Sequence, residues 1–148
     1  MTSLPQLQYR LAIDADIPAM SVIRRSVREN ILRDPSKVTI EMYHDYLHHA
    51  GRAWVCEYQG KIIGFSYAAL ADHSIWALFV SPEHEGLGAG KRLLKFACEW
   101  LFSQGAKQVQ LSTAAGTRAD RFYANQGWNR SELPDSRDVK FILPRPIR

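Results

Sequence analysis

Apolar residues recur every three or four positions near the start of the chain, which indicates a helix with one buried face. A short strand over 9–13 precedes this stretch, and Asp14 has a side chain that favours a helix N-cap. We expect the helix to run to about Asn30 and a turn to follow at 34–36. The positions that would face the core are Ile17, Met20, Ile23 and Val27.

A second helix and an antiparallel meander are predicted next. The helix would begin after Thr39, its cap, and close near Gly51. Residues 53–58 and 61–70 are strand-like on either side of a Gln-Gly turn, so they predict a hairpin. The β-branched and aromatic run 74–80 adds a third strand, and we expect all three strands to be antiparallel.

The second half of the chain alternates helices with strands. Residues 92–102 carry apolar side chains at helical spacing, and a short strand at 109–112 follows them. Because strand–helix–strand crossovers are right-handed, this strand should lie parallel to 74–80. A short helix over 118–125 and a closing hairpin that ends with 139–143 complete the pattern. The sequence thus predicts an α+β (α/β layered) fold with a mixed sheet.

Length and composition narrow the class of protein. The chain has 148 residues, 46% of them apolar, which suits one domain over 1–148. The first ten residues lack the apolar core of a secretory signal and no stretch suits a membrane span, so a cytoplasmic location is expected. Cys56 and Cys98 are unclustered, which fits neither a disulfide framework nor a metal set.

The formal net charge of +4 permits binding to a polyanion. Basic residues crowd one glycine-rich turn, at Lys91, Arg92 and Lys95, and do not form a long run. A nucleic-acid-binding domain would interleave aromatic and basic side chains, which this sequence does not do. The charge pattern therefore favours a polyanionic cofactor over nucleic acid.

The strongest motif is the glycine-rich turn at 83–92. It lies between a predicted strand and a predicted helix, where backbone N–H groups and the helix dipole favour a phosphate. A P-loop would need glycine in place of Glu85 and serine or threonine in place of Arg92, and the glycines do not fit a dinucleotide fingerprint. A phosphate-binding turn of another kind and a merely tight turn remain.

The turn resembles the Gln/Arg-x-x-Gly-x-Gly/Ala signature of the GNAT superfamily of N-acetyltransferases, with Glu85 in its first position. The segments 10–18 and 60–65 resemble the family's opening strand and helix and its central hairpin, so the resemblance covers nearly the whole chain. It implies a mixed sheet of about six to seven strands flanked by helices, with the fourth and fifth strands parallel. It also implies that the turn binds the pyrophosphate of coenzyme A while the Glu85 carboxylate points away. The cofactor-binding residues it implies are Phe79, Val80, Glu85, Gly86, Leu87, Gly88, Ala89, Gly90, Lys91 and Tyr123.

Two further segments resemble the family's chemical centre. The strand 76–80 is similar to its fourth strand, in which a bulge frees a backbone N–H toward the thioester carbonyl, here at Phe79 and Val80. The segment 121–128 resembles its Phe-Tyr-x-x-x-Gly-Phe/Trp motif and implies that Tyr123 is the general acid. A phenol stays protonated at neutral pH and can protonate the departing thiolate. The alternative is that Tyr123 only packs or orients the sulfur.

Several polar residues are candidates without an assigned role. An amine acceptor must lose a proton before attack, and Glu57, Asp72 and His73 lie on or beside the central strands; none is named as catalytic. Many relatives carry an asparagine near the position of Gly116, which puts that cofactor contact in doubt. Arg118 would contact a coenzyme A phosphate in its place, or is an exposed loop residue.

Two helical pairs are discounted. His44 and His48 lie one turn apart like two zincin ligands, but no third His or Cys follows with ligand spacing, so no metal site is predicted. Arg24, Arg25 and Arg28 would face solvent or a cleft. In GNAT folds this helix borders the acceptor pocket, which leaves an anionic acceptor open.

The sequence therefore predicts an acetyl-CoA-dependent N-acetyltransferase. The acetyl group would move directly to a primary amine of a small-molecule or protein acceptor in a ternary complex, because neither cysteine has a neighbouring base for an acyl-enzyme. The alternative is a non-catalytic acyl-CoA-binding regulatory module of the same fold, which Glu85 favours and Tyr123 opposes. A homodimer through an edge strand, common in such folds, is a further expectation. No membrane or nucleic-acid partner is expected.

Overall fold

The computed structural model describes residues 6–27, 38–134 and 136–146. Its seven strands form one mixed sheet in the order β1-β2-β3-β4-β5-β7-β6, which confirms the predicted fold. Strands β4 and β5 are parallel, also as predicted, and the other neighbouring pairs are antiparallel. The elements are β1 (Leu7–Leu11), η1 (Asp14–Asp16), α1 (Ile17–Ser26), α2 (Ile40–His48), β2 (Gly51–Tyr58), β3 (Lys61–Ala69), β4 (Ser74–Val80), η4 (Pro82–His84), α3 (Ala89–Ser103), β5 (Gln108–Ala114), α4 (Arg118–Asn125), β6 (Asn129–Glu132) and β7 (Asp138–Pro144).

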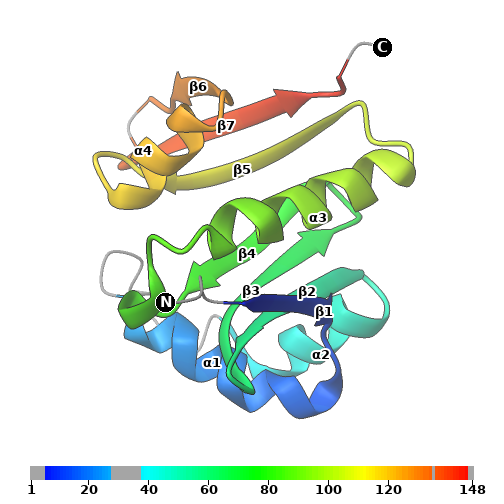
Figure 1. The fold of residues 1–148 in the computed structure, drawn as a ribbon. Helices are drawn as coiled ribbons and strands as arrows, with labels where there is room; N and C mark the ends of the chain where they lie inside the picture. Colours follow the sequence, from blue (N-terminus) through cyan, green and yellow to red (C-terminus); the bar gives the residue numbers. More distant parts are fainter. Residues whose placement is uncertain (1–5, 28–37, 135, 147–148) are drawn as a thin grey trace.

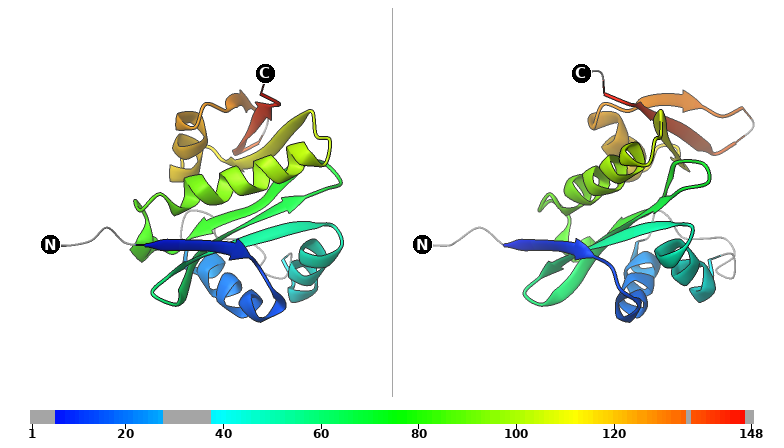
Figure 2. Two further views of the ribbon diagram at one scale, coloured as in Figure 1. Left: turned by 45° about the vertical axis from the view of Figure 1, so that its right-hand side comes forward. Right: turned by 90° about the vertical axis from the view of Figure 1, so that its right-hand side faces the viewer.

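The helices cover both faces of the sheet. Figures 1 and 2 show α1 and α2 on one face of strands β1–β4 and α3 on the other. Under α1 and α2, the predicted helix face Ile17, Met20 and Ile23 is buried against Tyr43 and Phe65. A second apolar cluster lies under α3 and α4 and extends to β5 and β7. No helix among the described residues is long and apolar enough to cross a membrane.

The first helix differs from its prediction at both ends. Its entry is a 3-10 turn, and Asp14 does not cap it; the Asp16 carboxylate accepts the Ile13 N–H at 2.8 Å instead. Helix α1 ends at Ser26 because Val27 is already extended, so the predicted continuation to Asn30 is wrong. The predicted turn at 34–36 lies outside the described residues.

Strand β1 lies two residues earlier than the predicted 9–13, and the remaining elements follow their predictions closely. The Thr39 hydroxyl accepts the Met42 N–H and caps α2 as expected. Helix α4 has the predicted bounds, and so does β4. Helix α3 begins three residues earlier than predicted, at Ala89, because the glycine turn itself supplies its first turn.

Candidate active site

A cleft of about 560 Å³ opens where β4 and β5 diverge, within the size range of small-molecule and cofactor sites. The two parallel strands pair at Ser74 and Gln110 in the described structure, and their carboxyl ends lie apart. The glycine turn and α4 form the other walls. Nine of the ten residues that the sequence assigned to the cofactor line this cleft, and Leu87, which is 39% exposed, does not.

The glycine turn presents open backbone to the cleft. Gly86 and Gly88 have φ angles of 84° and 87°, in the region that favours glycine, and a Cβ at either would meet nothing within 4 Å. Gly88 is the N-cap of α3 and has no side chain to cap it, so the first N–H groups of the helix stay open. Such a terminus is suited to bind an anion.

The turn, β4 and α4 converge at Gly90. A Cβ built there would lie 3.7 Å from Val80 Cγ2 and 3.8 Å from Phe122 Cζ. These are ordinary contact distances, so the backbone of α3 approaches both walls closely. The segments that the sequence identified separately therefore form one site.

The bulge that the resemblance placed at Phe79 and Val80 lies elsewhere. The β3–β4 register shifts at Trp76, the extra residue between Ile75 and Ala77. Phe79 and Val80 follow in regular register, so the expected position is wrong. A bulge is a property of a strand pair, and the composition of β4 alone does not locate it.

The alternation of hydrogen bonds along β3 and β4 determines the direction of the Val80 N–H. The Ser81 N–H donates to the Ile63 carbonyl at 2.7 Å, which makes these two residues a hydrogen-bonded pair at the end of the β3–β4 ladder. Pairs alternate along antiparallel strands, so Val80, opposite Gly64, is a pair without hydrogen bonds. The Val80 N–H therefore points away from β3, toward the open side of β4.

Tyr123 lines the cleft from α4 and is 6% exposed. Its ring centroid lies 5.2 Å from that of Phe122 and 5.6 Å from those of Trp128 and Phe141. Its hydroxyl makes no hydrogen bond to any described residue. Burial, and to a smaller extent the nearby Cys98, raises the pKa of Tyr123 well above its usual value. The phenol is thus rigidly held and neutral.

Glu85 and Arg118 bridge two walls of the cleft. Glu85 Oε2 lies 2.7 Å from Arg118 Nη1, and both residues line the cleft from the glycine turn and from the start of α4. The Glu85 carboxylate therefore does not simply point away, as the resemblance implied. It pairs with Arg118, for which the sequence left open a phosphate contact or an exposed position in a loop.

The structure adds cleft residues that sequence reasoning missed. His84 directly precedes the family signature that begins at Glu85, and its ring stacks edge to face on Tyr58 at 5.8 Å. Its Nδ1 is buried and has no partner among the described residues. Its place beside the motif was a usable signal, whereas nothing in the sequence pointed to Ser26 and Val27, which line the cleft from the end of α1.

The three candidates for the general base do not line the cleft. Glu57 Oε1 on β2 forms an ion pair at 2.6 Å with Arg10 on the edge strand β1. Asp72 Oδ1 accepts the Ser74 hydroxyl at 2.6 Å, and His73 lies beside it in the β3–β4 turn, at the opposite end of β4 from Val80. Their positions exclude direct proton transfer within the cleft.

Two other sequence candidates lie against apolar layers, Arg24 half-buried and Cys98 buried. The Arg24 guanidinium lies 5.0 Å from the Phe79 ring and 5.5 Å from the Trp76 ring, so it neither faces open solvent nor lines the cleft. Arg25 is exposed, as predicted, and Arg28 lies outside the described residues. Cys98 is buried, and burial raises the pKa of its thiol to about 12, which opposes a thiolate nucleophile.

Comparison with known proteins places this site in a family. Several solved structures share the fold. The PaiA N-acetyltransferase of Thermoplasma acidophilum, in complex with coenzyme A, matches with a TM-score of 0.80 and 16% identity over 95% of this chain and 99% of that chain. The ribosomal-protein-S18-alanine N-acetyltransferase of Escherichia coli matches with a TM-score of 0.74 and 18% identity over 97% of this chain and 96% of that chain. A Bacillus anthracis protein assigned as a streptothricin acetyltransferase, in complex with acetyl coenzyme A, matches with a TM-score of 0.76 and 20% identity. The match covers 95% of this chain and 99% of that chain.

These identities are low, so the structural matches show the fold. No curated protein matches the sequence. The sequence profile of the Acetyltransferase (GNAT) family matches residues 19–128, which are 110 of the 148 residues and include the glycine turn and Tyr123. The chain therefore belongs to the GNAT family and is an acetyltransferase.

Proposed function

We propose that the protein uses acetyl-CoA to acetylate a primary amine by direct transfer in a ternary complex. The observation that carries this proposal is the convergence of an uncapped helix N-terminus, a free strand amide and a buried phenol on one cleft. Binding of coenzyme A or acetyl coenzyme A by two of the structural neighbours supports the choice of cosubstrate.

The pyrophosphate of the cosubstrate would bind at the glycine turn. The open N–H groups of Ala89, Gly90 and Lys91 and the positive end of the α3 dipole suit its charge. Lys91 lines the same turn and adds a positive charge. Arg118 lies across the cleft and would exchange its carboxylate partner, Glu85, for a phosphate.

The thioester would lie along β4. Attack by the amine nitrogen on the acyl carbon develops negative charge on the carbonyl oxygen, and a fixed backbone donor stabilises that charge. The Val80 N–H has the required direction, because its strand partner lies on the other side. The apolar walls formed by Leu78, Phe79 and Phe122 exclude water from the reacting bond.

Tyr123 would donate the proton that the leaving group needs. When the C–S bond breaks, the thiolate takes the phenolic proton, and the amine loses its extra proton to water in the open cleft. The pKa of Tyr123, raised by burial, keeps the donor protonated throughout the neutral range. It also makes the phenol a weaker acid, so its contribution should fall toward the lower end of general-acid effects.

The test separates this enzyme from a non-catalytic module of the same fold. Calorimetry with acetyl-CoA should show binding, and release of free thiol should depend on an amine from a panel of polyamines, amino acids and peptide N-termini. Binding without amine-dependent thiol release across the panel would favour the regulatory module. Absence of binding at millimolar acetyl-CoA would contradict both readings.

We also propose a cytoplasmic location, where acetyl-CoA is available, and a homodimer formed through a sheet edge. The outer strands β1 and β6 each pair on one side only in the described structure, which leaves backbone groups for a second chain. Sedimentation velocity of the purified chain at micromolar concentration tests the dimer. A monomer mass throughout would contradict it.

A further inference from the structure

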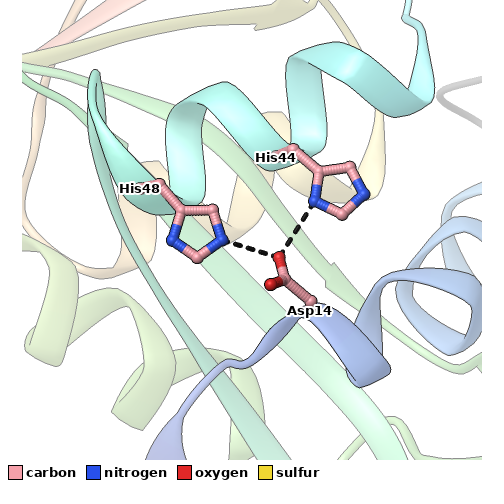
Figure 3. A group of neighbouring side chains, drawn as sticks. All are labelled: Asp14, His44 and His48. Carbon is pink, nitrogen blue, oxygen red and sulfur yellow. Dashed lines mark hydrogen bonds and ion pairs between the residues drawn. The ribbon is translucent and has the colours of Figure 1, made fainter.

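Three side chains with metal-binding atoms meet between η1 and α2 (Figure 3), and none of them lines the cleft. Asp14 Oδ1 lies 2.9 Å from His44 Nδ1 and 2.7 Å from His48 Nε2. All three ligand atoms lie within 4.8 Å of one another. The two histidines lie one turn apart on α2, and Asp14 projects toward them from η1. The sequence showed the two histidines, but Asp14 precedes His44 by 30 residues and gave no spacing signal.

We propose that Asp14, His44 and His48 bind a divalent transition-metal ion, with Zn²⁺ as the best match. Two imidazole nitrogens and one carboxylate oxygen form a ligand set that zinc uses in proteins, and water would fill the fourth position. The histidine rings are nearly parallel, with an interplanar angle of 11°, and both turn a nitrogen toward the same oxygen.

To form a zinc site, the ligand atoms must shift, and the two histidine nitrogens, which lie within 4.8 Å of each other, must reach the separation of tetrahedral ligands. In tetrahedral zinc with bonds of about 2.0–2.1 Å, neighbouring ligand atoms lie about 3.3 Å apart. The nitrogen-to-oxygen distances of 2.7 and 2.9 Å would therefore open by about half an ångström. The side chains are 45% to 56% exposed, so they can move by this amount without disturbing the core.

The charge at this cluster also suits a cation. The Asp14 carboxylate contacts both histidine rings and supplies the negative charge of the cluster. Within the described part of the chain, no lysine or arginine forms an ion pair with Asp14. This distinguishes it from Asp16 two residues later, which Arg10 neutralises at 2.7 Å.

The position of the cluster indicates a structural role for the ion. Asp14 lies at the start of the η1–α1 segment, whereas Ser26 and Val27 at its other end line the cleft. Twelve residues of helix span about 18 Å, so the ion would not contact the reacting atoms. It would instead fasten the start of α1 to α2, and thereby brace the helix whose far end borders the site.

Metal titration of the untagged chain tests the proposal. After removal of metal with a chelator and dialysis, calorimetry with ZnCl₂ should give one site, and Co²⁺ should bind with the intense visible absorption of tetrahedral coordination. A saturating ion should raise the melting temperature by about 5 °C. MgCl₂ should neither give a calorimetric site nor raise the melting temperature, because Mg²⁺ prefers oxygen ligands in octahedral geometry.

Matched variants show whether these side chains are the ligands. Asp14→Asn keeps an acceptor for the histidines but removes the charge, and we expect it, His44→Gln and His48→Gln each to weaken Zn²⁺ binding more than tenfold. Loss of a residue that only hydrogen-bonds to a metal ligand typically lowers metal affinity by about 10–100-fold, so loss of a direct ligand should lower it by more than tenfold. His49→Gln, an exposed neighbour outside the cluster, should bind as the parent does. The proposal would be overturned if the parent had no Zn²⁺ site, or if the three ligand variants bound Zn²⁺ as tightly as the parent. The cluster would then be a set of hydrogen bonds that joins η1 to α2.

Discussion

Replacing Tyr123 by phenylalanine removes the proposed proton donor while keeping the ring. The ring packs against Phe122, Trp128 and Phe141 at centroid distances of 5.2, 5.6 and 5.6 Å, and these contacts persist in the variant. No described residue forms a hydrogen bond with the hydroxyl, so removing it leaves none of them with an unsatisfied buried polar group. The free energy of unfolding should therefore change by less than about 1 kcal/mol. Truncation to alanine, by contrast, would cost about 3–5 kcal/mol.

The rate should respond far more than the stability. General acids contribute about 10²–10⁴-fold, or about 2.7–5.4 kcal/mol of the barrier. The raised pKa of Tyr123 makes it a weak acid, so we expect a loss near 10²-fold in turnover. Affinity for acetyl-CoA should stay within about twofold, since the phenol is assigned to a step after binding.

The assay combines thiol release at saturating acceptor with calorimetric binding of acetyl-CoA. A solvent isotope effect or a pre-steady-state burst would establish whether chemistry limits the rate. The matched control is Tyr58→Phe, which deletes a phenol beside His84 but outside the residues that line the cleft. A Tyr123→Phe enzyme within threefold of the parent, with chemistry limiting, would refute the general-acid role and leave Tyr123 as a packing residue.

Two further predictions concern the walls of the cleft, and a third concerns the ion pair between Asp120 and Arg130. Glu85→Gln should tighten acetyl-CoA binding about fivefold by calorimetry, because removing a carboxylate a few ångströms from the phosphate site relieves about 1 kcal/mol of repulsion; weaker binding would mean that its ion pair with Arg118 organises the site. Gly88→Ala should lose acetyl-CoA affinity, whereas Gly60→Ala, with a similar positive φ in the β2–β3 turn, should lose only about 1–2 kcal/mol of stability; equal affinities would contradict a role for the turn. The pKa of Asp120 is lowered first by the Arg130 guanidinium and then by the Gly116 N–H, so its stabilisation is present above about pH 4 and lost as the pH falls through the lowered value. Melting temperatures from pH 7 to pH 3 should fall more steeply for the parent than for Asp120→Asn, and parallel curves would contradict this linkage.

Much of the fold was predictable from local signals in the sequence. The bounds of β4 and α4, the Thr39 cap and the parallel arrangement of β4 and β5 all followed from periodicity, capping residues and crossover handedness. The glycine turn was also local, because the positive φ angles of Gly86 and Gly88 depend on the residue type itself. These features were recognisable because each is decided within about a dozen neighbouring residues.

The features that the sequence missed depend on partners that are distant along the chain. The bulge lies at Trp76 because of how β4 pairs with β3, and α1 stops at Ser26 although apolar spacing continues to Val27. Glu85 faces Arg118 from another element, and so the carboxylate was expected in the wrong direction.

The cluster of Asp14, His44 and His48 shows most clearly the difference between features decided by neighbouring residues and features decided by distant partners. The histidine pair on α2 is visible as an i, i+4 spacing, whereas Asp14 reads locally as a helix cap. Only the packing of η1 against α2 turns its carboxylate toward both rings. The sequence by itself determined which elements form and which backbone is open to a phosphate, because short-range sterics and hydrogen bonding decide these. Tertiary structure decided which side chains share a site, because the distance between two elements depends on the packing of the whole sheet and its helices.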